Sequence, residues 1–142
     1  MIKKLDRSTF QALMQRLSQA WAQQDTEAAL TCFAQDAVYM QPPDVQFYRG
    51  HQQLRAYFGA LRPGVFLEYQ NIWFDESRQT GCVEFSFGNR ANPQADHGCI
   101  VVEVEDGLIA HWREYVQKGP ADFGEFTATE GKQWQWHIGN YP

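Results

Sequence analysis

The stretch 107–116 holds the residue of this chain that is best suited to proton transfer. It follows an Asp-Gly turn and alternates as a strand does, so that Trp112, Glu114 and Val116 point to the same side. A carboxylate between two apolar residues on one face is costly to bury unless it is paired, hydrogen-bonded or protonated. Glu114 is therefore a candidate general acid or base. The pattern fits equally well with a face that meets solvent or another subunit, where Glu114 would form only a salt bridge.

Glu84 and Tyr39 are the residues expected to work with Glu114. Two neighbouring carboxyls hold different pKa values, so that one takes a proton or activates a water while the other donates. The Tyr39 hydroxyl can polarise a carbonyl or epoxide oxygen by a hydrogen bond. Both residues have structural alternatives. Glu84 shares a polar strand face with Cys82 and Ser86 that also suits contact with water, and Tyr39 equally suits a core phenol.

The four histidines do not form a metal motif. No two of them have the close spacing of zinc ligands, so we expect no metal site. His97 follows Asp96 at the end of a hairpin and can reach the mouth of a cavity, although a surface position is the commoner outcome for such a residue. The chain has no Gly-x-Ser-x-Gly motif, Gly-rich phosphate loop or dinucleotide-binding fingerprint, so we expect no cofactor.

Length and composition exclude several classes of protein. At 142 residues the chain is long enough for one domain with a hydrophobic core, which we expect to span residues 1–142. Its net charge of −5, without a dense Lys/Arg cluster, argues against nucleic acid or an anionic membrane surface as a partner. No window approaches the roughly 20 apolar residues of a membrane span. Three cysteines without a Cys-x-x-Cys motif cannot all pair in one chain and favour a reducing compartment, so we expect a cytoplasmic location.

Helical spacing of apolar residues comes first along the chain. A capping box at Ser8 and Gln11 predicts one helix. A second helix is expected to start at Asp25 and run through Phe33, and a third to begin near Gly50.

Strand alternation follows the helices. A short strand is expected over 37–40, and an antiparallel meander of four strands over 65–74, 82–87, 99–105 and 107–116. Helices followed by strands predict an α+β fold rather than alternating βαβ units. We expect a cone-shaped α+β roll, in which three N-terminal helices pack in a curved antiparallel sheet and leave a pocket against its concave face.

Several segments together carry a resemblance to a known family. They are residues 21–25, 33–39, the Arg49-Gly50 pair before a helix, 104–109, and the Trp-Arg-Glu-Tyr run at 112–115. In these segments the chain resembles SnoaL-like domains of the nuclear-transport-factor-2-like superfamily, over about residues 8–118. The resemblance implies the α+β roll. It does not fix an activity, because the superfamily includes isomerases, cyclases, epoxide hydrolases, dehydratases and non-catalytic domains.

Within the superfamily, the motifs are most similar to those of limonene-epoxide-hydrolase-like proteins. The resemblance places Tyr39 on the family's tyrosine, Gln41 on its asparagine and Glu114 on its last aspartate. On the middle strand Glu84 is the only acid, and Cys82 stands where the family has an arginine. Without that guanidinium between the two acids, epoxide hydrolysis is disfavoured and a generic acid/base site remains.

The expected pocket has further lining residues and a partner. The residues expected to contact the ligand are Gln41, Trp112, Phe58, His97 and Trp21. The aromatic residues of the last segment suit either a lid over the pocket or a contact with a partner: Trp134, Trp136, His137 and Tyr141. The superfamily commonly pairs two subunits through the convex face of the sheet, so a homodimer is expected through a second apolar face. That face would consist of Val83, Phe85, Phe87 and Ile109.

Two functions remain open at this stage. The first is a cofactor-independent enzyme, an isomerase, cyclase or hydrolase, that uses carboxylate acid/base chemistry on a small hydrophobic molecule. The second is a non-catalytic ligand-binding or dimerisation domain of the same fold, whose pocket is filled by aromatic side chains or holds a ligand without converting it. The position of Glu114 between Trp112 and Val116 favours the first, and the missing arginine favours the second.

Overall fold

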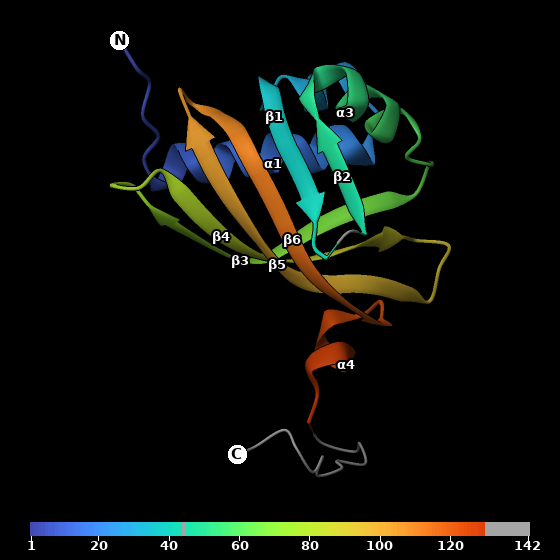
Figure 1. The fold of residues 1–142 in the computed structure, drawn as a ribbon. Helices are drawn as coiled ribbons and strands as arrows, with labels where there is room; N and C mark the ends of the chain where they lie inside the picture. The colour runs from blue at the N-terminus through green and yellow to red at the C-terminus, as the bar shows by residue number, and fades with distance from the viewer. Residues whose placement is uncertain (44, 130–142) are drawn as a thin grey trace.

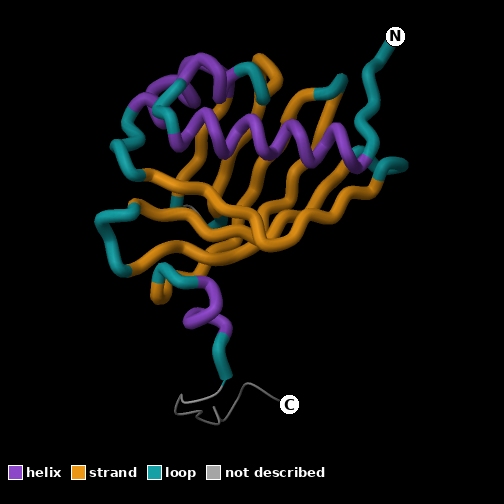
Figure 2. The backbone as a smooth tube through the Cα atoms, turned by 180° about the vertical axis from the view of Figure 1, so that it is seen from behind, coloured by secondary structure: helices purple, strands orange, loops and turns teal. Residues whose placement is uncertain are grey.

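A curved sheet wrapped around helices is the main feature of the computed structural model, which describes residues 1–43 and 45–129. In this part of the chain, six strands form one sheet, and the first three helices lie on its concave side (Figure 1 and Figure 2). In chain order the elements are α1 (Arg7–Ala22), α2 (Thr26–Leu30), β1 (Phe33–Gln41), β2 (Gln46–Arg49), α3 (Gly50–Gly59), β3 (Val65–Asp75), β4 (Thr80–Asn89), β5 (Gln94–Glu105), β6 (Leu108–Pro120) and α4 (Phe123–Thr127).

The strands lie across the sheet in the order β2-β1-β6-β5-β4-β3. The antiparallel meander from β3 to β6 and the cone-shaped α+β roll are confirmed. The sheet differs from the expectation in two ways: β1 pairs with β6 in the parallel sense, and β2 adds an antiparallel edge strand beside β1. The parallel pairing is possible because residues 42–107 separate β1 from β6, and parallel neighbours need a long connection.

The first helix starts two residues earlier than the sequence pattern predicts. Asp6, not Ser8, is the N-cap: its carboxylate accepts a hydrogen bond from the backbone N–H of Thr9 at 2.8 Å, and the Thr9 hydroxyl accepts one from the Asp6 N–H at 2.9 Å. The capping box therefore uses Asp6 and Thr9. Ser8 lies in the first turn and donates its hydroxyl to the same carboxylate at 2.8 Å.

Replacement of Asp6 is expected to destabilise the fold more than replacement of Ser8, the residue that the sequence pattern predicts as the cap. Asp6→Ala removes the acceptor for the Thr9 N–H and should lower the free energy of unfolding by about 1 kcal/mol. Ser8→Ala leaves that bond in place and should cost less than half as much. Urea denaturation of the two variants measures the difference, and equal losses would contradict the assignment of Asp6 as the cap.

The second helix ends earlier than expected. α2 stops at Leu30, and Phe33 opens β1 instead of closing a helix. The Cys32 carbonyl accepts a hydrogen bond from the Ile109 N–H at 2.9 Å, which ties this connection to β6. Phe33 is 1% exposed because its ring packs in the core. Tertiary burial of this one ring therefore overrides the helical spacing. The third helix does begin at Gly50, as expected.

The core lies between the helices and the concave face of the sheet, and it contains the apolar face that was expected to pair two subunits. Val83, Phe85 and Ile109 are at most 1% exposed, and Phe87 packs against the same core. The assignment of these residues to the subunit contact is wrong, because strand alternation shows which residues share a face but not which face the helices cover. The homodimer itself stays a prediction. No helix among residues 1–43 and 45–129 is both long and apolar enough to cross a membrane.

Candidate functional site

Glu114 is buried inside the roll, as its position between Trp112 and Val116 predicts. The residue is 8% exposed. One carboxylate oxygen, Oε2, accepts hydrogen bonds from the indole Nε1–H of Trp112 at 3.1 Å and from the Tyr39 hydroxyl at 3.3 Å. The other, Oε1, accepts one from the Gln46 side-chain amide at 3.1 Å. All three donors are neutral, so Glu114 is held by hydrogen bonds rather than by the salt bridge of the alternative interpretation.

Three neighbouring strands bring these groups together. The parallel register of β1 and β6 places Tyr39 beside Trp112, and their rings stack at 5.2 Å between centroids with an interplanar angle of 11°. Glu114 follows Trp112 by two residues on the same face of β6. β2 pairs with β1 so that Gln46 lies opposite Gln41, which puts the Gln46 amide within reach of the carboxylate.

Burial raises the pKa of the Glu114 carboxyl above its ordinary value of 4.5. Desolvation is the largest cause, since it disfavours the charged form, and the hydrogen bonds from Trp112, Tyr39 and Gln46 oppose it by stabilising the anion. Such a carboxyl is ionised less readily than a surface glutamate, and its protonated form persists to a higher pH. This property suits a general acid or base.

The neighbouring phenols remain protonated at neutral pH. Burial raises the pKa of Tyr57, on α3, to about 12, and it raises the pKa of Tyr39 well above 10. The Glu114 carboxylate adds to both increases, because a nearby negative charge disfavours a phenolate. Both hydroxyls therefore keep their protons beside Glu114, and Tyr39 donates its proton to the carboxylate.

Aromatic rings fill the space that was expected to be an open pocket. Trp21 lies 5.4 Å from Phe58 and 6.1 Å from Trp112 between ring centroids, and all three side chains are at most 2% exposed. The expected lining residues Trp21, Phe58 and Trp112 are thus brought together, but packed against one another, and of the three Trp112 is the one that contacts Glu114. The Trp21 indole Nε1–H is buried and has no hydrogen-bond partner among the described residues.

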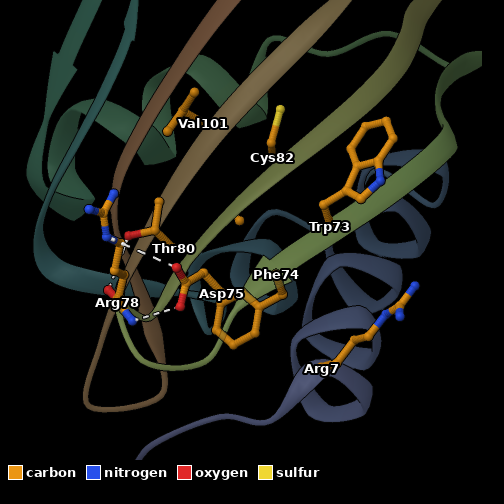
Figure 3. Close-up of a pocket in the computed structure, with 9 residues that line it drawn as sticks. Arg7, Trp73, Phe74, Asp75, Arg78, Thr80, Cys82 and Val101 are labelled. Atoms are coloured by element: carbon orange, nitrogen blue, oxygen red, sulfur yellow. Dashed lines mark hydrogen bonds and ion pairs between the residues drawn. The ribbon is translucent and has the colours of Figure 1, made fainter.

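The hollows on the described residues lie elsewhere. A polar one of about 670 Å³ follows the edge of the sheet between α1 and β3, and another of about 430 Å³ lies near the end of the β3–β4 hairpin (Figure 3). Glu114 lines neither of them. Gln46 on the short edge strand β2 is the partly exposed group in contact with the carboxylate.

Glu84 lies on the opposite face of the sheet from Glu114. The strand register aligns Glu84 with Cys99 and Cys99 with Tyr115, whereas Glu114 is aligned with Ile100. The Asn71 amide donates to the Glu84 carboxylate at 2.7 Å on the outer side. The expected carboxylate pair is therefore not formed. The residue directly beside Glu114 on β5 is the apolar Ile100.

His97 also lies on the outer face, and it is buried rather than at a cavity mouth or on the surface. Residues around α4 cover it: the Phe126 ring stacks on the imidazole at 4.2 Å, and the Pro120 carbonyl lies 2.6 Å from Nε2. Its Nδ1 lies 2.7 Å from the Ser86 hydroxyl. Only 1% of the residue is exposed, so it has a structural position remote from Glu114.

Two residues near Glu114 were not predicted as site residues. Tyr57 belongs to the apolar face of α3, and its spacing of three residues from Leu54 is a signal that could have found it. Gln46 has no such signal, because its hydrogen bond spans 68 residues and depends on the β1–β2 pairing. Gln41 ends β1 opposite Gln46. The aromatic residues Trp134, Trp136, His137 and Tyr141 lie outside the described residues.

The described residues hold no obvious metal centre: nowhere in 1–43 and 45–129 do three or more His, Cys, Asp or Glu side chains gather closely enough to bind an ion. The residues around Glu114 are one acid, an amide and several aromatic side chains. This donor set suits hydrogen bonding and proton transfer to an organic molecule rather than metal coordination.

The chain belongs to the SnoaL-like domain family, whose model matches residues 14–112. Membership of this family places the chain in the nuclear-transport-factor-2-like superfamily, as the sequence resemblance implied. No curated protein matches the chain.

Solved structures confirm the fold at low sequence identity. A protein of unknown function with a cystatin-like fold from Methylobium petroleophilum is 16% identical, with a TM-score of 0.72, over 94% of this chain and all of its own. A proposed ketosteroid isomerase from Kribbella flavida is 17% identical, with a TM-score of 0.68, over 90% of this chain and 93% of its own. A limonene-epoxide-hydrolase-like enzyme from M. tuberculosis is 20% identical, with a TM-score of 0.62, over 78% and 84%. At these identities the likeness establishes the fold alone.

Proposed function

We propose that this SnoaL-like protein binds a small, largely hydrophobic molecule beside Glu114 and that Glu114 moves a proton on it. The observation that carries the proposal is the Glu114 carboxyl itself. It is 8% exposed, is held by three neutral donors among aromatic rings, and has a pKa above its ordinary value. A buried carboxyl without a cationic partner is costly to maintain, and proton transfer is a common reason for such a group.

A single carboxyl favours one kind of reaction over another. Hydrolysis by two cooperating acids needs a second carboxyl beside the first, but the position directly beside Glu114 on β5 is Ile100. Asp96, whose charge helps to raise the Glu114 pKa, lies four residues further along that strand. Isomerisation needs only one: the carboxylate takes a proton from a carbon next to a carbonyl, the electron pair of the C–H bond moves toward the carbonyl oxygen, and the proton returns to another carbon. An isomerase of enolisable ketones is therefore the best-supported reaction, and a proposed ketosteroid isomerase is among the structures of the same fold.

The ligand's oxygen would find donors in the same region. The Tyr57 hydroxyl stays protonated, and the Trp21 Nε1–H is a buried donor without a partner among the described residues, whereas the Tyr39 hydroxyl already donates to Glu114. An unpaired buried donor costs roughly 1–3 kcal/mol, so a ligand carbonyl that accepts from it recovers this energy. The Gln46 amide, on the edge strand β2, is the contact that a ligand can replace at the Glu114 carboxylate.

A second candidate is a domain that binds a ligand, or another copy of itself, without catalysis. The packed interior favours it, because the rings of Trp21, Phe58 and Trp112 occupy the space a substrate needs. The outer face also keeps Trp73 and Tyr115 about half exposed, at 52% and 51%, which suits association with a second copy. Measurement of ligand binding and turnover separates this candidate from the enzyme.

An NMR titration of Glu114 tests the proposal directly. The side-chain carboxyl resonance is assigned by its loss in Glu114→Gln, and Glu84→Gln, altered on the other face of the sheet, is the control variant that should keep this resonance. We expect Glu114 to titrate above 4.5. Addition of a cyclic enone should shift the Glu114 titration and the Trp21 indole N–H resonance together. A Glu114 pKa at or below 4.5, or no response to any enolisable ketone or epoxide, would overturn the acid/base function.

The same pKa sets the pH dependence of stability. The folded state holds the Glu114 proton more tightly than the unfolded state, so the wild-type protein loses stability as the pH rises from about 4.5 through the raised pKa. Glu114→Gln carries no such charge, and Gln46 can turn its amide to accept from the new side chain. The stability of the variant relative to wild type should therefore increase over this pH range. Thermal unfolding of both proteins at several pH values provides the measurement.

A further inference from the structure

Two cysteines share the outer face of the sheet, away from Glu114. Cys82 on β4 is aligned with Val101 on β5, and Cys99 on β5 is aligned with Glu84 on β4. The two cysteines are therefore diagonal neighbours on adjacent antiparallel strands, with side chains on the same side. Cys99 is exposed and Cys82 is partly exposed, whereas the third cysteine, Cys32, is buried in the core.

A hollow on the outer face gives access to Cys82. Cys82 lines the hollow of about 430 Å³ near the β3–β4 hairpin, together with Trp73 and Val101. Figure 3 shows the Cys82 sulfur standing between these two side chains, which form an apolar wall on either side of it. Trp73 is 52% exposed, so its ring is available to a ligand. If the Cys82 thiol binds an atom that carries an organic group, that organic group would lie against the Trp73 ring.

The spacing of the pair favours a bridging atom over a direct disulfide. Diagonal neighbours across antiparallel strands are about 7–8 Å apart. Disulfides usually join residues whose Cα atoms are about 4.4–6.8 Å apart. An atom inserted between the sulfurs spans the larger separation without movement of the strands. Trivalent arsenic and soft metal ions are such thiophilic atoms.

The negative charge of Glu84 favours arsenic(III) over copper(I) at these thiols. Glu84 lies directly beside Cys99, and the pKa of the Cys99 thiol is raised by burial and by the nearby Cys82 and Glu84. A copper(I) ion bound by two thiolates would carry a negative charge next to the Glu84 carboxylate. An arsenic(III) centre bound by two thiols forms a neutral product, so it avoids this repulsion.

We propose that Cys82 and Cys99 together form a two-thiol site for a trivalent arsenical, with its organic group against Trp73. With phenylarsine oxide, two S–H bonds and the As=O bond break, two As–S bonds form, and one water leaves. Arsenic stays trivalent, so the step needs no oxidant or reductant. This site is independent of Glu114 and of the proposed proton transfer.

Mass spectrometry of the native protein with phenylarsine oxide tests the proposal. We expect one phenylarsenic group per chain that persists in excess 2-mercaptoethanol and is removed by the dithiol 2,3-dimercaptopropanol. Cys82→Ser and Cys99→Ser should each lower the affinity by about 10²-fold or more, because each removes one of two linked bonds. Trp73→Ala keeps both thiols and should lower the affinity by a smaller factor. Cys32 in the wild-type protein should stay unmodified.

Two results would overturn the site. One is equal retention of the arsenical by wild type and either serine variant, which would mean that single thiols bind it. The other is no adduct on the native chain together with an adduct on the chain unfolded in urea, which would mean that the outer face is covered, for example by a second copy. Cys82→Ala and Cys99→Ala provide a second pair of variants if a serine side chain impairs folding.

Discussion

Glu114→Gln is expected to slow the exchange of the α-protons of a bound enolisable ketone with solvent deuterium by about 10²–10⁴-fold. The glutamine keeps the size of the side chain and can keep the contacts with Trp112 and Tyr39, but it cannot take a proton from carbon. Proton NMR in deuterated buffer follows the loss of the α-proton signal for each protein. The loss in rate should appear in the chemical step, while the affinity for the ketone changes little.

Glu84→Gln is the matched control for this experiment. It removes a carboxylate whose partner is Asn71 on the outer face, and it should leave the exchange rate unchanged. Equal rates in wild type and Glu114→Gln would assign the exchange to solvent or buffer and leave the protein as a non-catalytic binding domain. A large loss in Glu84→Gln would contradict the separation of the two acids by the sheet.

Trp112→Ala is expected to lower the free energy of unfolding by about 3–5 kcal/mol. The Trp112 ring is fully buried and contacts Trp21, Phe33 and Tyr39, so its removal leaves a cavity that these rings cannot fill without moving. Urea denaturation measures the loss. Trp73→Ala, which truncates a tryptophan that is 52% exposed, should cost less than about 1 kcal/mol. Similar losses in the two variants would contradict the position of Trp112 in the core.

Trp112→Phe separates packing from hydrogen bonding at the same position. The phenyl ring keeps most of the buried surface, but the Nε1–H that donates to Glu114 is lost. Because that bond lowers the pKa of Glu114, its removal should raise the pKa further. The NMR titration of Glu114 in this variant gives the result. An unchanged or lower pKa would mean that the Trp112 indole does not stabilise the carboxylate.

Local sequence alone determined the strand that carries Glu114. An Asp-Gly pair suits a tight hairpin, and Asp106 and Gly107 do take positive φ angles of 49° and 81° at this turn. Period-two alternation then puts Glu114 on the same side as Trp112. These features depend only on residues near one another in the chain, so the sequence predicts them. The helices α1 and α3 follow from local spacing of apolar residues in the same way.

Tertiary structure alone decided which face of the sheet the helices cover and which residues meet Glu114. Alternation on β4 separates Glu84 from Val83 and Phe85 but carries no sign of inside or outside, so Glu84 proved to lie on the outer face. The hydrogen bond from Gln46 exists because β2 pairs with β1 and β1 lies parallel to β6. Gln46 and Glu114 are far apart in the sequence, so no local sequence pattern predicts their contact. Burial of the carboxyl, and with it the raised pKa of Glu114, therefore depends on the assembled roll.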